Sequence, residues 1–155
     1  MSEKKPTILF VCTGNTCRSP MAEALAKSIL ENAGLAANIH SAGVSAGGRY
    51  PASENAVYAM HDENCDLSAH ISSQISQEIL ISASLVLTMT STHLQIIKGM
   101  CPQVNAFTLC EYSGADGDVS DPFGGDLQTY IKCATQIKQL ILSSMTKLKE
   151  ELWKA

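Results

Sequence analysis

Apolar residues along the chain form two alternating patterns, short continuous runs and longer stretches with helical spacing. The short runs predict buried strands at residues 7–11, 84–89 and 104–108, and a weaker run predicts a further strand at 38–41. The stretches with helical spacing predict helices at residues 20–33, 51–61, 74–82 and 127–152, with a short helix after 90. Strands that alternate with helices predict a twisted α/β sheet of four parallel strands flanked by helices, with ligands at the carboxyl ends of its strands.

Capping residues indicate where several of these helices begin. Pro51 is a favourable first residue for the second predicted helix. Ser72 or Ser73 precedes the third, and Ser91 or Thr92 stands at the start of the short helix. A hydroxyl at such a place caps a helix by accepting a backbone N–H.

The composition is typical of globular proteins. Its 155 residues fit one domain spanning 1–155, with 45% hydrophobic residues, 17% charged residues and a formal net charge of −4. This charge balance offers no basic surface for nucleic acid. No segment is long and apolar enough for a signal peptide or a membrane span. We expect a cytoplasmic protein that acts as a monomer, with no nucleic-acid or membrane partner.

The six cysteines include no Cys-x-x-Cys pair of the kind found in zinc and redox sites. We therefore expect no metal and no cofactor, and thiols that stay reduced in the cytoplasm. Three of the cysteines are predicted to be small core residues, namely Cys65, Cys110 and Cys133. Three histidines are predicted to be structural or exposed rather than ligands, namely His40, His61 and His93.

The turn from Cys12 to Ser19, between the first strand and the first helix, is where the sequence places its chemistry. A strand-to-helix turn directs backbone N–H groups and the positive end of the helix dipole at one point, which suits phosphate-like anions. Arg18 adds a guanidinium that binds two phosphoryl oxygens. Such a field favours the thiolate of a cysteine, so Cys12 is a candidate nucleophile that forms a covalent cysteinyl-phosphate. Ser19 is placed to donate a hydrogen bond to Cys12 when the sulfur leaves.

The loop at 112–125 is dense in glycine and carboxylates, and a loop of this length usually carries a function. It offers the acid that the leaving group needs. Asp121 is the first choice, because Pro122 fixes the local backbone and Phe123 can form a wall of the pocket. Three other carboxylates stay open for the role, namely Asp116, Asp118 and Asp126.

These residues resemble the low-molecular-weight protein-tyrosine-phosphatases, whose signature is Cys-x5-Arg-Ser near the N-terminus with Asp-Pro near residue 120. The resemblance covers essentially the whole chain. It implies Cys12 as nucleophile, Arg18 as phosphate clamp, and Asp121 as general acid and later general base. The residues that it implies around the substrate are Thr13, Gly14, Asn15, Thr16, Cys17 and Phe123.

The same resemblance implies supporting roles. Asn15 holds the strained backbone of the loop, and it is supported by Ser19, Ser41 and His70. The resemblance also implies that Cys17 forms a protective disulfide with Cys12 on oxidation, while a plain packed thiol at Cys17 stays open.

Two departures from the tyrosine-specific pattern bear on the substrate. Thr16 stands where those enzymes usually have isoleucine, and Phe123 is followed by two glycines rather than by a second aromatic residue. Both features resemble the bacterial protein-arginine-phosphatase branch, where threonine at this place marks specificity. A shorter, polar side chain reshapes the pocket wall, and the loss of an aromatic clamp weakens stacking on a phenyl ring. We therefore predict hydrolysis of phosphoarginine in phosphorylated protein substrates.

Three alternatives stay open. The same machinery hydrolyses phosphotyrosine in the tyrosine-specific enzymes. Thioredoxin-coupled arsenate reductases share the fold and the loop, but they carry a cysteine pair after the third strand, where this chain reads Met-Thr-Ser-Thr and has only Cys101 further on. A phosphoprotein-binding module without turnover is disfavoured by the intact nucleophile, clamp and acid. Arg49 and Tyr50 are expected either at the rim of the pocket or in an exposed loop.

Overall fold

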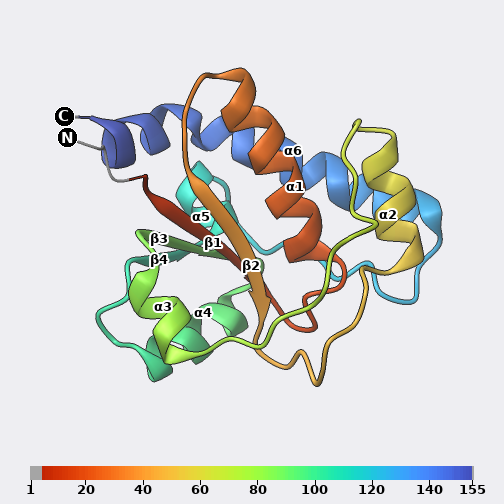
Figure 1. The fold of residues 1–155 in the computed structure, drawn as a ribbon, viewed down its shortest axis with the longest axis horizontal. Helices are drawn as coiled ribbons and strands as arrows, with labels where there is room; N and C mark the ends of the chain where they lie inside the picture. The colour runs from red at the N-terminus through yellow and green to blue at the C-terminus, as the bar shows by residue number, and fades with distance from the viewer. Residues whose placement is uncertain (1–4, 155) are drawn as a thin grey trace.

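The computed structural model describes residues 5–154, and its centre is a parallel sheet of four strands. The strands are β1 (Thr7–Cys12), β2 (Asn38–Gly43), β3 (Leu85–Thr88) and β4 (Ala106–Thr108). They lie in the order β2-β1-β3-β4, so the chain leaves β1 to one side for β2 and then crosses to the other side for β3 (Figure 1). The predicted fold class is confirmed. The reversal at β1 makes its carboxyl end the switch point where α/β sheets bind ligands.

β1 is buried on both faces, because a separate apolar core covers each face of the sheet. Its successive side chains enter two different apolar cores. Ile8, Phe10 and Cys12 belong to one core, and Leu9 and Val11 belong to the other. The continuous apolar run that predicted this strand is thus explained by two covered faces.

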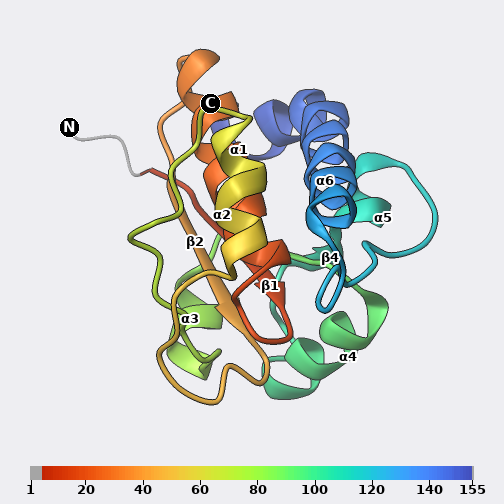
Figure 2. The same cartoon turned by 90° about the vertical axis from the view of Figure 1, so that its right-hand side faces the viewer.

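Helices cover both cores. The first core packs against α1 (Arg18–Asn32), α2 (Glu54–His61), α5 (Leu109–Ser113) and α6 (Leu127–Leu148). The second packs against α3 (Gln77–Ser82) and α4 (Ser91–Met100), which lie at the bottom of Figure 2. The last predicted helix is divided, because α6 ends at 148 and continues as the π-helical segment η1 (Lys149–Trp153). No helix within residues 5–154 is long and apolar enough to cross a membrane.

The helix predicted to begin at Pro51 begins at Glu54 instead. Pro51 forms an isolated antiparallel bridge with Ile71, so its backbone serves a contact between two loops. Ser53 precedes the first residue of α2 in an extended conformation. The apolar face predicted for the helix is retained from residue 54 onward.

The predicted cap of α3 was wrong. Ser76 caps the helix, since its hydroxyl accepts the backbone N–H of Ile79 at 3.2 Å. Ser72 is fully buried, and its hydroxyl accepts the backbone N–H of Tyr50 at 2.8 Å. The backbone carbonyl of Ser73 accepts from Gly43 at 2.8 Å. The segment before α3 therefore runs extended beside β2 and delays the start of the helix.

The predicted cap of α4 was also wrong. Thr90 caps this helix, in place of Ser91 or Thr92, and its hydroxyl accepts the backbone N–H of His93 at 3.3 Å. The side chain of His93 accepts in turn from the backbone N–H of Thr90. These two bonds form a reciprocal capping box in which histidine takes the place of the usual glutamate.

The loop predicted at 112–125 begins with the end of a helix that the sequence pattern did not indicate. α5 is capped by Thr108 and ends at Gly114, whose φ of 87° is left-handed. Five residues are too few to show helical periodicity, which explains why α5 was missed. The irregular segment that carries Asp121 thus begins at residue 114.

Candidate active site

The carboxyl end of β1 and the start of α1 enclose a pocket of about 220 Å³. α1 begins at Arg18, two residues before its predicted start, so Arg18 and Ser19 form part of its first turn. The unpaired N–H groups and the positive dipole end of this helix point toward the turn. The residues that line the pocket are Cys12, Thr13, Gly14, Thr16, Cys17, Arg18, Asp121 and Phe123.

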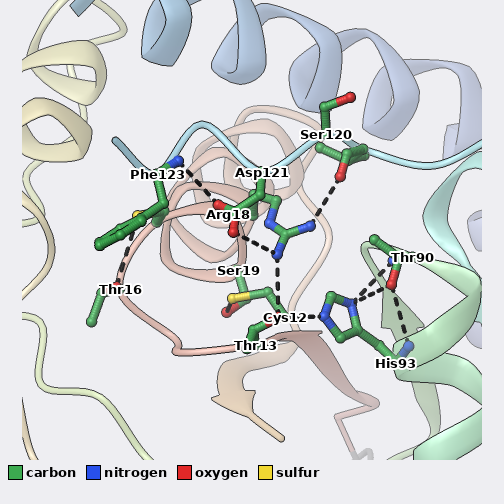
Figure 3. Close-up of polar contacts among 12 residues, drawn as sticks. Cys12, Thr13, Thr16, Arg18, Ser19, Thr90, His93, Ser120, Asp121 and Phe123 are labelled. Atoms are coloured by element: carbon green, nitrogen blue, oxygen red, sulfur yellow. Dashed lines mark hydrogen bonds and ion pairs between the residues drawn. The ribbon is translucent and has the colours of Figure 1, made fainter. Parts of the chain in front are cut away.

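Cys12 ends β1 and is 2% exposed. Its Sγ lies 2.9 Å from Oγ of Ser19. Asn15 Nδ2 donates to the same Ser19 oxygen at 2.8 Å, which leaves the Ser19 proton free for the sulfur. A thiolate at Cys12 therefore has a hydrogen-bond donor already in place (Figure 3).

Asn15 holds the turn in a left-handed conformation, with φ 57°. Its side chain is buried, and Nδ2 donates to Ser41 Oγ at 2.9 Å as well as to Ser19. Its Oδ1 accepts the backbone N–H of Ser73 at 2.8 Å, and its carbonyl lies 2.8 Å from Nε2 of His70. Such backbone strain costs on the order of 1 kcal/mol, which these contacts offset. Of these four partners, Ser73 was not anticipated from the sequence.

β2 supports the turn from the side. A Cβ on Gly43 would collide with the backbone carbonyl of Thr13, so only glycine fits there. Ser41, two residues earlier, donates to Glu23 Oε1 at 2.6 Å. Glu23 lies on α1 and was not singled out from the sequence, because its contact with β2 is invisible to local patterning.

Arg18 is 4% exposed, which is unusual for arginine. Its Nη1 donates to the backbone carbonyl of Val119 at 3.0 Å. Its Nη2 donates to Thr13 Oγ1 at 3.4 Å and lies 3.6 Å from Asp121 Oδ2. Two segments therefore meet at one guanidinium, namely the turn through Thr13 and the acidic loop through Val119 and Asp121.

Asp121 lies at the pocket, and half of its side chain is exposed. Its Oδ1 accepts the backbone N–H of Phe123 at 3.1 Å, which turns the loop back toward the site. Phe123 is 77% exposed and forms one wall of the pocket. Thr16 also lines the pocket, and both residues are drawn in Figure 3.

The competing carboxylates lie elsewhere. Asp118 accepts the backbone N–H of Ser91 at 3.0 Å, at the start of α4. Asp126 caps α6, and its hydrogen bonds with Thr129 lower the pKa of its carboxyl. Asp116 lines a different hollow, beside α4 and α5. The geometry therefore favours Asp121 as the carboxylate that reaches a bound group.

His93 is a site neighbour that sequence reasoning did not identify. It is 4% exposed, and its Nε2 lies 2.8 Å from Thr13 Oγ1. Burial and the nearby Arg18 lower the pKa of His93 to about 4. A usable signal was its position shortly after β3, because the carboxyl end of β3 lies beside that of β1.

The Cys17 sulfur has three hydroxyl neighbours, and Thr16 Oγ1 lies furthest from it at 3.8 Å. The same Sγ lies 3.4 Å from both Ser53 Oγ and Tyr130 Oη. Burial raises the pKa of Tyr130 to about 12. All six cysteines are free thiols, so Cys17 is a packed thiol here.

The other predicted side chains lie outside the pocket. His40 and His61 are exposed, and Arg49 and Tyr50 do not line the pocket. Of the remaining cysteines, Cys101, Cys110 and Cys133 are buried and Cys65 is half-buried. Within residues 5–154, no group of histidine, cysteine and carboxylate side chains is arranged to hold a metal ion.

Comparison with known proteins bears directly on this arrangement. Residues 7–154 match the family described as low molecular weight phosphotyrosine protein phosphatase. The chain belongs to this family. It is 46% identical over 147 residues to the protein-arginine-phosphatase of Bacillus subtilis, covering 93% of this chain and 97% of that protein. It is 38% identical over 135 residues to the low molecular weight protein-tyrosine-phosphatase PtpB of Staphylococcus epidermidis, covering 86% and 93%.

A solved relative of this low-molecular-weight phosphatase is a cysteine-to-serine mutant of the arginine phosphatase YwlE with a phosphorylated active-site serine. It superposes with a TM-score of 0.88 and 44% sequence identity, covering 94% of this chain and 97% of that one. In that protein the phosphoryl group is thus attached to the substituted residue of the active site.

Proposed function

We propose that this low-molecular-weight phosphatase hydrolyses phosphoarginine in proteins through a cysteinyl-phosphate on Cys12. The observation that carries the proposal is the pocket itself, in which a buried cysteine and a buried arginine face a half-exposed aspartate and a threonine. The similarity to the arginine phosphatase of Bacillus subtilis supports the choice of substrate.

In the first step the Cys12 thiolate attacks phosphorus, and the bond from phosphorus to the arginine nitrogen breaks. Free guanidine is strongly basic, so its nitrogen must receive a proton as it leaves. Asp121 is the acid placed to supply that proton. Arg18 and the N–H groups of the turn hold the other phosphoryl oxygens while charge redistributes.

In the second step water attacks the phosphorus of the cysteinyl-phosphate. Asp121, now a carboxylate, takes the proton from that water. The bond from phosphorus to sulfur breaks, and its electron pair returns to Cys12 as thiolate. Ser19 stabilises that thiolate through the 2.9 Å contact, and inorganic phosphate leaves.

The choice of phosphoarginine rests on Thr16 and Phe123. Thr16 gives the pocket wall a hydroxyl and less bulk than isoleucine at that place. Phe123 is a single exposed aromatic ring followed by two glycines, so it offers stacking from one side. A guanidinium group also suits the nearby carboxylate of Asp121.

The deciding experiment compares kcat/KM on matched phosphoarginine and phosphotyrosine peptides. We expect the unmodified protein to prefer phosphoarginine by about tenfold or more, and Thr16→Ile to reduce that preference by a similar factor. Thr135→Ile, on an exposed position of α6, is the matched control and should leave the preference unchanged.

The second candidate is a protein-tyrosine-phosphatase with the same mechanism, which the similarity to PtpB favours. A strong phosphotyrosine preference in the unmodified protein would establish it and refute the arginine assignment. Tight binding of both peptides without phosphate release would refute both in favour of a binding module.

The cellular setting is part of the proposal. A thiolate nucleophile must stay reduced, which favours a reducing compartment, and we propose the cytoplasm. We propose that it acts as a monomer and as one catalytic domain over residues 1–155, because a single pocket holds nucleophile, clamp and acid together.

A further inference from the structure

His93 reaches the active site from α4, a helix that otherwise covers the opposite core. Its ring lies between Thr90 and Thr13 (Figure 3). The backbone N–H of Thr90 donates to His93 Nδ1 at 3.2 Å. A ring nitrogen that accepts a hydrogen bond carries no proton, so the neutral ring holds its proton on Nε2.

Among residues 5–154, the Nε2 proton has one hydrogen-bond acceptor, the hydroxyl oxygen of Thr13 at 2.8 Å. Arg18 Nη2 donates to the same oxygen at 3.4 Å. A hydroxyl oxygen has two lone pairs, and these two donors occupy both. The Thr13 proton is therefore taken by neither neighbour, and Thr13 lines the pocket where a phosphoryl group would bind.

We propose that His93 is a positioning residue of the phosphatase site, which fixes the Thr13 hydroxyl so that its oxygen holds Arg18 and its proton faces the bound phosphoryl group. This inference rests on the proposed phosphatase function. His93 itself lies outside the lining of the pocket and acts through Thr13.

The contacts of Arg18 show why Thr13 matters. Within residues 5–154, Nη2 has two oxygen neighbours, Thr13 Oγ1 at 3.4 Å and Asp121 Oδ2 at 3.6 Å. Asp121 is half exposed and is needed at the leaving group during the reaction. Thr13 is therefore the contact that remains on Arg18 Nη2 when the Asp121 side chain turns to the leaving group.

The charge state of the ring agrees with this role. Burial and the positive charge of Arg18 lower the pKa of His93 to about 4, while Asp118 and Asp121 oppose the shift. The ring is thus neutral at physiological pH, where it donates to Thr13 without adding a second cation beside Arg18.

A double-mutant cycle of His93→Asn and Thr13→Val tests the inference. Asparagine keeps a polar group near the Nδ1 position but is too short to reach Thr13, and valine removes the hydroxyl at constant size. We expect each single variant to weaken inhibition by vanadate about tenfold, and the double variant to weaken it about tenfold rather than a hundredfold. His93→Gln restores a donor near the Nε2 position and should recover most of the affinity.

Hydrolysis of 4-nitrophenyl phosphate supplies the second readout, and it does not depend on the choice between phosphoarginine and phosphotyrosine. Partial unfolding lowers the apparent kcat in proportion to the folded fraction and leaves KM and the vanadate inhibition constant unchanged. The matched control is His61→Asn, at an exposed position of α2. It should leave all three parameters unchanged.

The outcomes separate the two claims. If the unmodified protein neither hydrolyses the aryl phosphate nor binds vanadate, the phosphatase function fails and this inference fails with it. If it does both, but His93→Asn leaves the vanadate constant unchanged, or the single effects multiply in the double variant, the positioning role alone is overturned.

Discussion

Replacing Ser19 with alanine tests how the turn handles negative charge on the nucleophile. Ser19 is fully buried, and its oxygen lies 2.9 Å from Cys12 Sγ and accepts from Asn15 Nδ2 at 2.8 Å. Alanine removes the donor to sulfur. Asn15 keeps its second hydrogen bond, to Ser41 at 2.9 Å, so the turn should keep its shape.

The expected magnitude follows from the charge on sulfur. A hydrogen bond to an ionised group contributes about 1.5–3 kcal/mol, which corresponds to about a 10- to 150-fold change in rate. The effect falls mainly on the second step, because there Cys12 leaves as a thiolate. In the first step the loss is smaller, since a less stabilised thiolate is also the stronger nucleophile.

Rapid-quench kinetics with a phosphoarginine peptide measures the two steps separately. For Ser19→Ala we expect a burst of dephosphorylated peptide followed by slow turnover, with a covalent phosphoenzyme that accumulates during the reaction. Ser28→Ala is the matched control, on the same helix about 14 Å further along. Equal slowing of both steps, with no accumulated phosphoenzyme, would refute the leaving-group role of Ser19.

Three further changes test other parts of the site. Gly43→Ala should lower the free energy of unfolding in urea by about 1–3 kcal/mol and weaken vanadate binding, because the added Cβ collides with the Thr13 carbonyl. Gly99→Ala is the control, because its Cβ meets open space. Equal losses of stability from both changes would contradict the argument from the close approach of Gly43 to Thr13. Asp121→Asn should lower kcat/KM, which reports on the first step, by about 10²–10⁴-fold on phosphoarginine peptides. The loss should be smaller on 4-nitrophenyl phosphate, because its leaving group needs no proton, and equal losses in kcat/KM would contradict the acid role. The pKa of His93 falls from its usual 6.5 to about 4 in the folded protein. Its contribution to the free energy of unfolding is therefore present above pH 6.5 and is lost as the pH falls toward 4. The full shift sets a ceiling of about 3 kcal/mol on this loss. Urea unfolding of His93→Gln should show less pH dependence over this range than the unmodified protein, and parallel curves would contradict the shift.

Local patterning was sufficient to predict the sheet and the turn that carries the proposed nucleophile. The strand from Thr7 to Cys12 is a continuous apolar run because both its faces are covered, and the glycine, arginine and serine that follow it are contiguous in the sequence. The helix starts were less predictable. The chain before α3 stays extended beside β2, and Ser76 rather than an earlier serine becomes the cap.

Contacts between distant residues could not be predicted from spacing alone. His93 is 80 residues from Thr13, and Val119 is 101 residues from Arg18. Both pairs exist because β3 lies directly beside β1, which brings the segments after β3 to the edge where β1 ends. The order of the strands is a tertiary property, so these partners become visible only once it is known.

That strand order also couples the phosphate site to the acid. Val119 is fully buried, and its backbone N–H donates to the carbonyl of Met89 at 2.9 Å, just after β3. The carbonyl of Val119, which lies two residues before Asp121, accepts a hydrogen bond from Arg18. Arg18 is therefore hydrogen-bonded to a loop that is itself anchored to the sheet. In the proposed mechanism, this anchored loop keeps Asp121 within reach of the leaving group, and its half-exposed side chain can turn from Arg18 to that group and then to water.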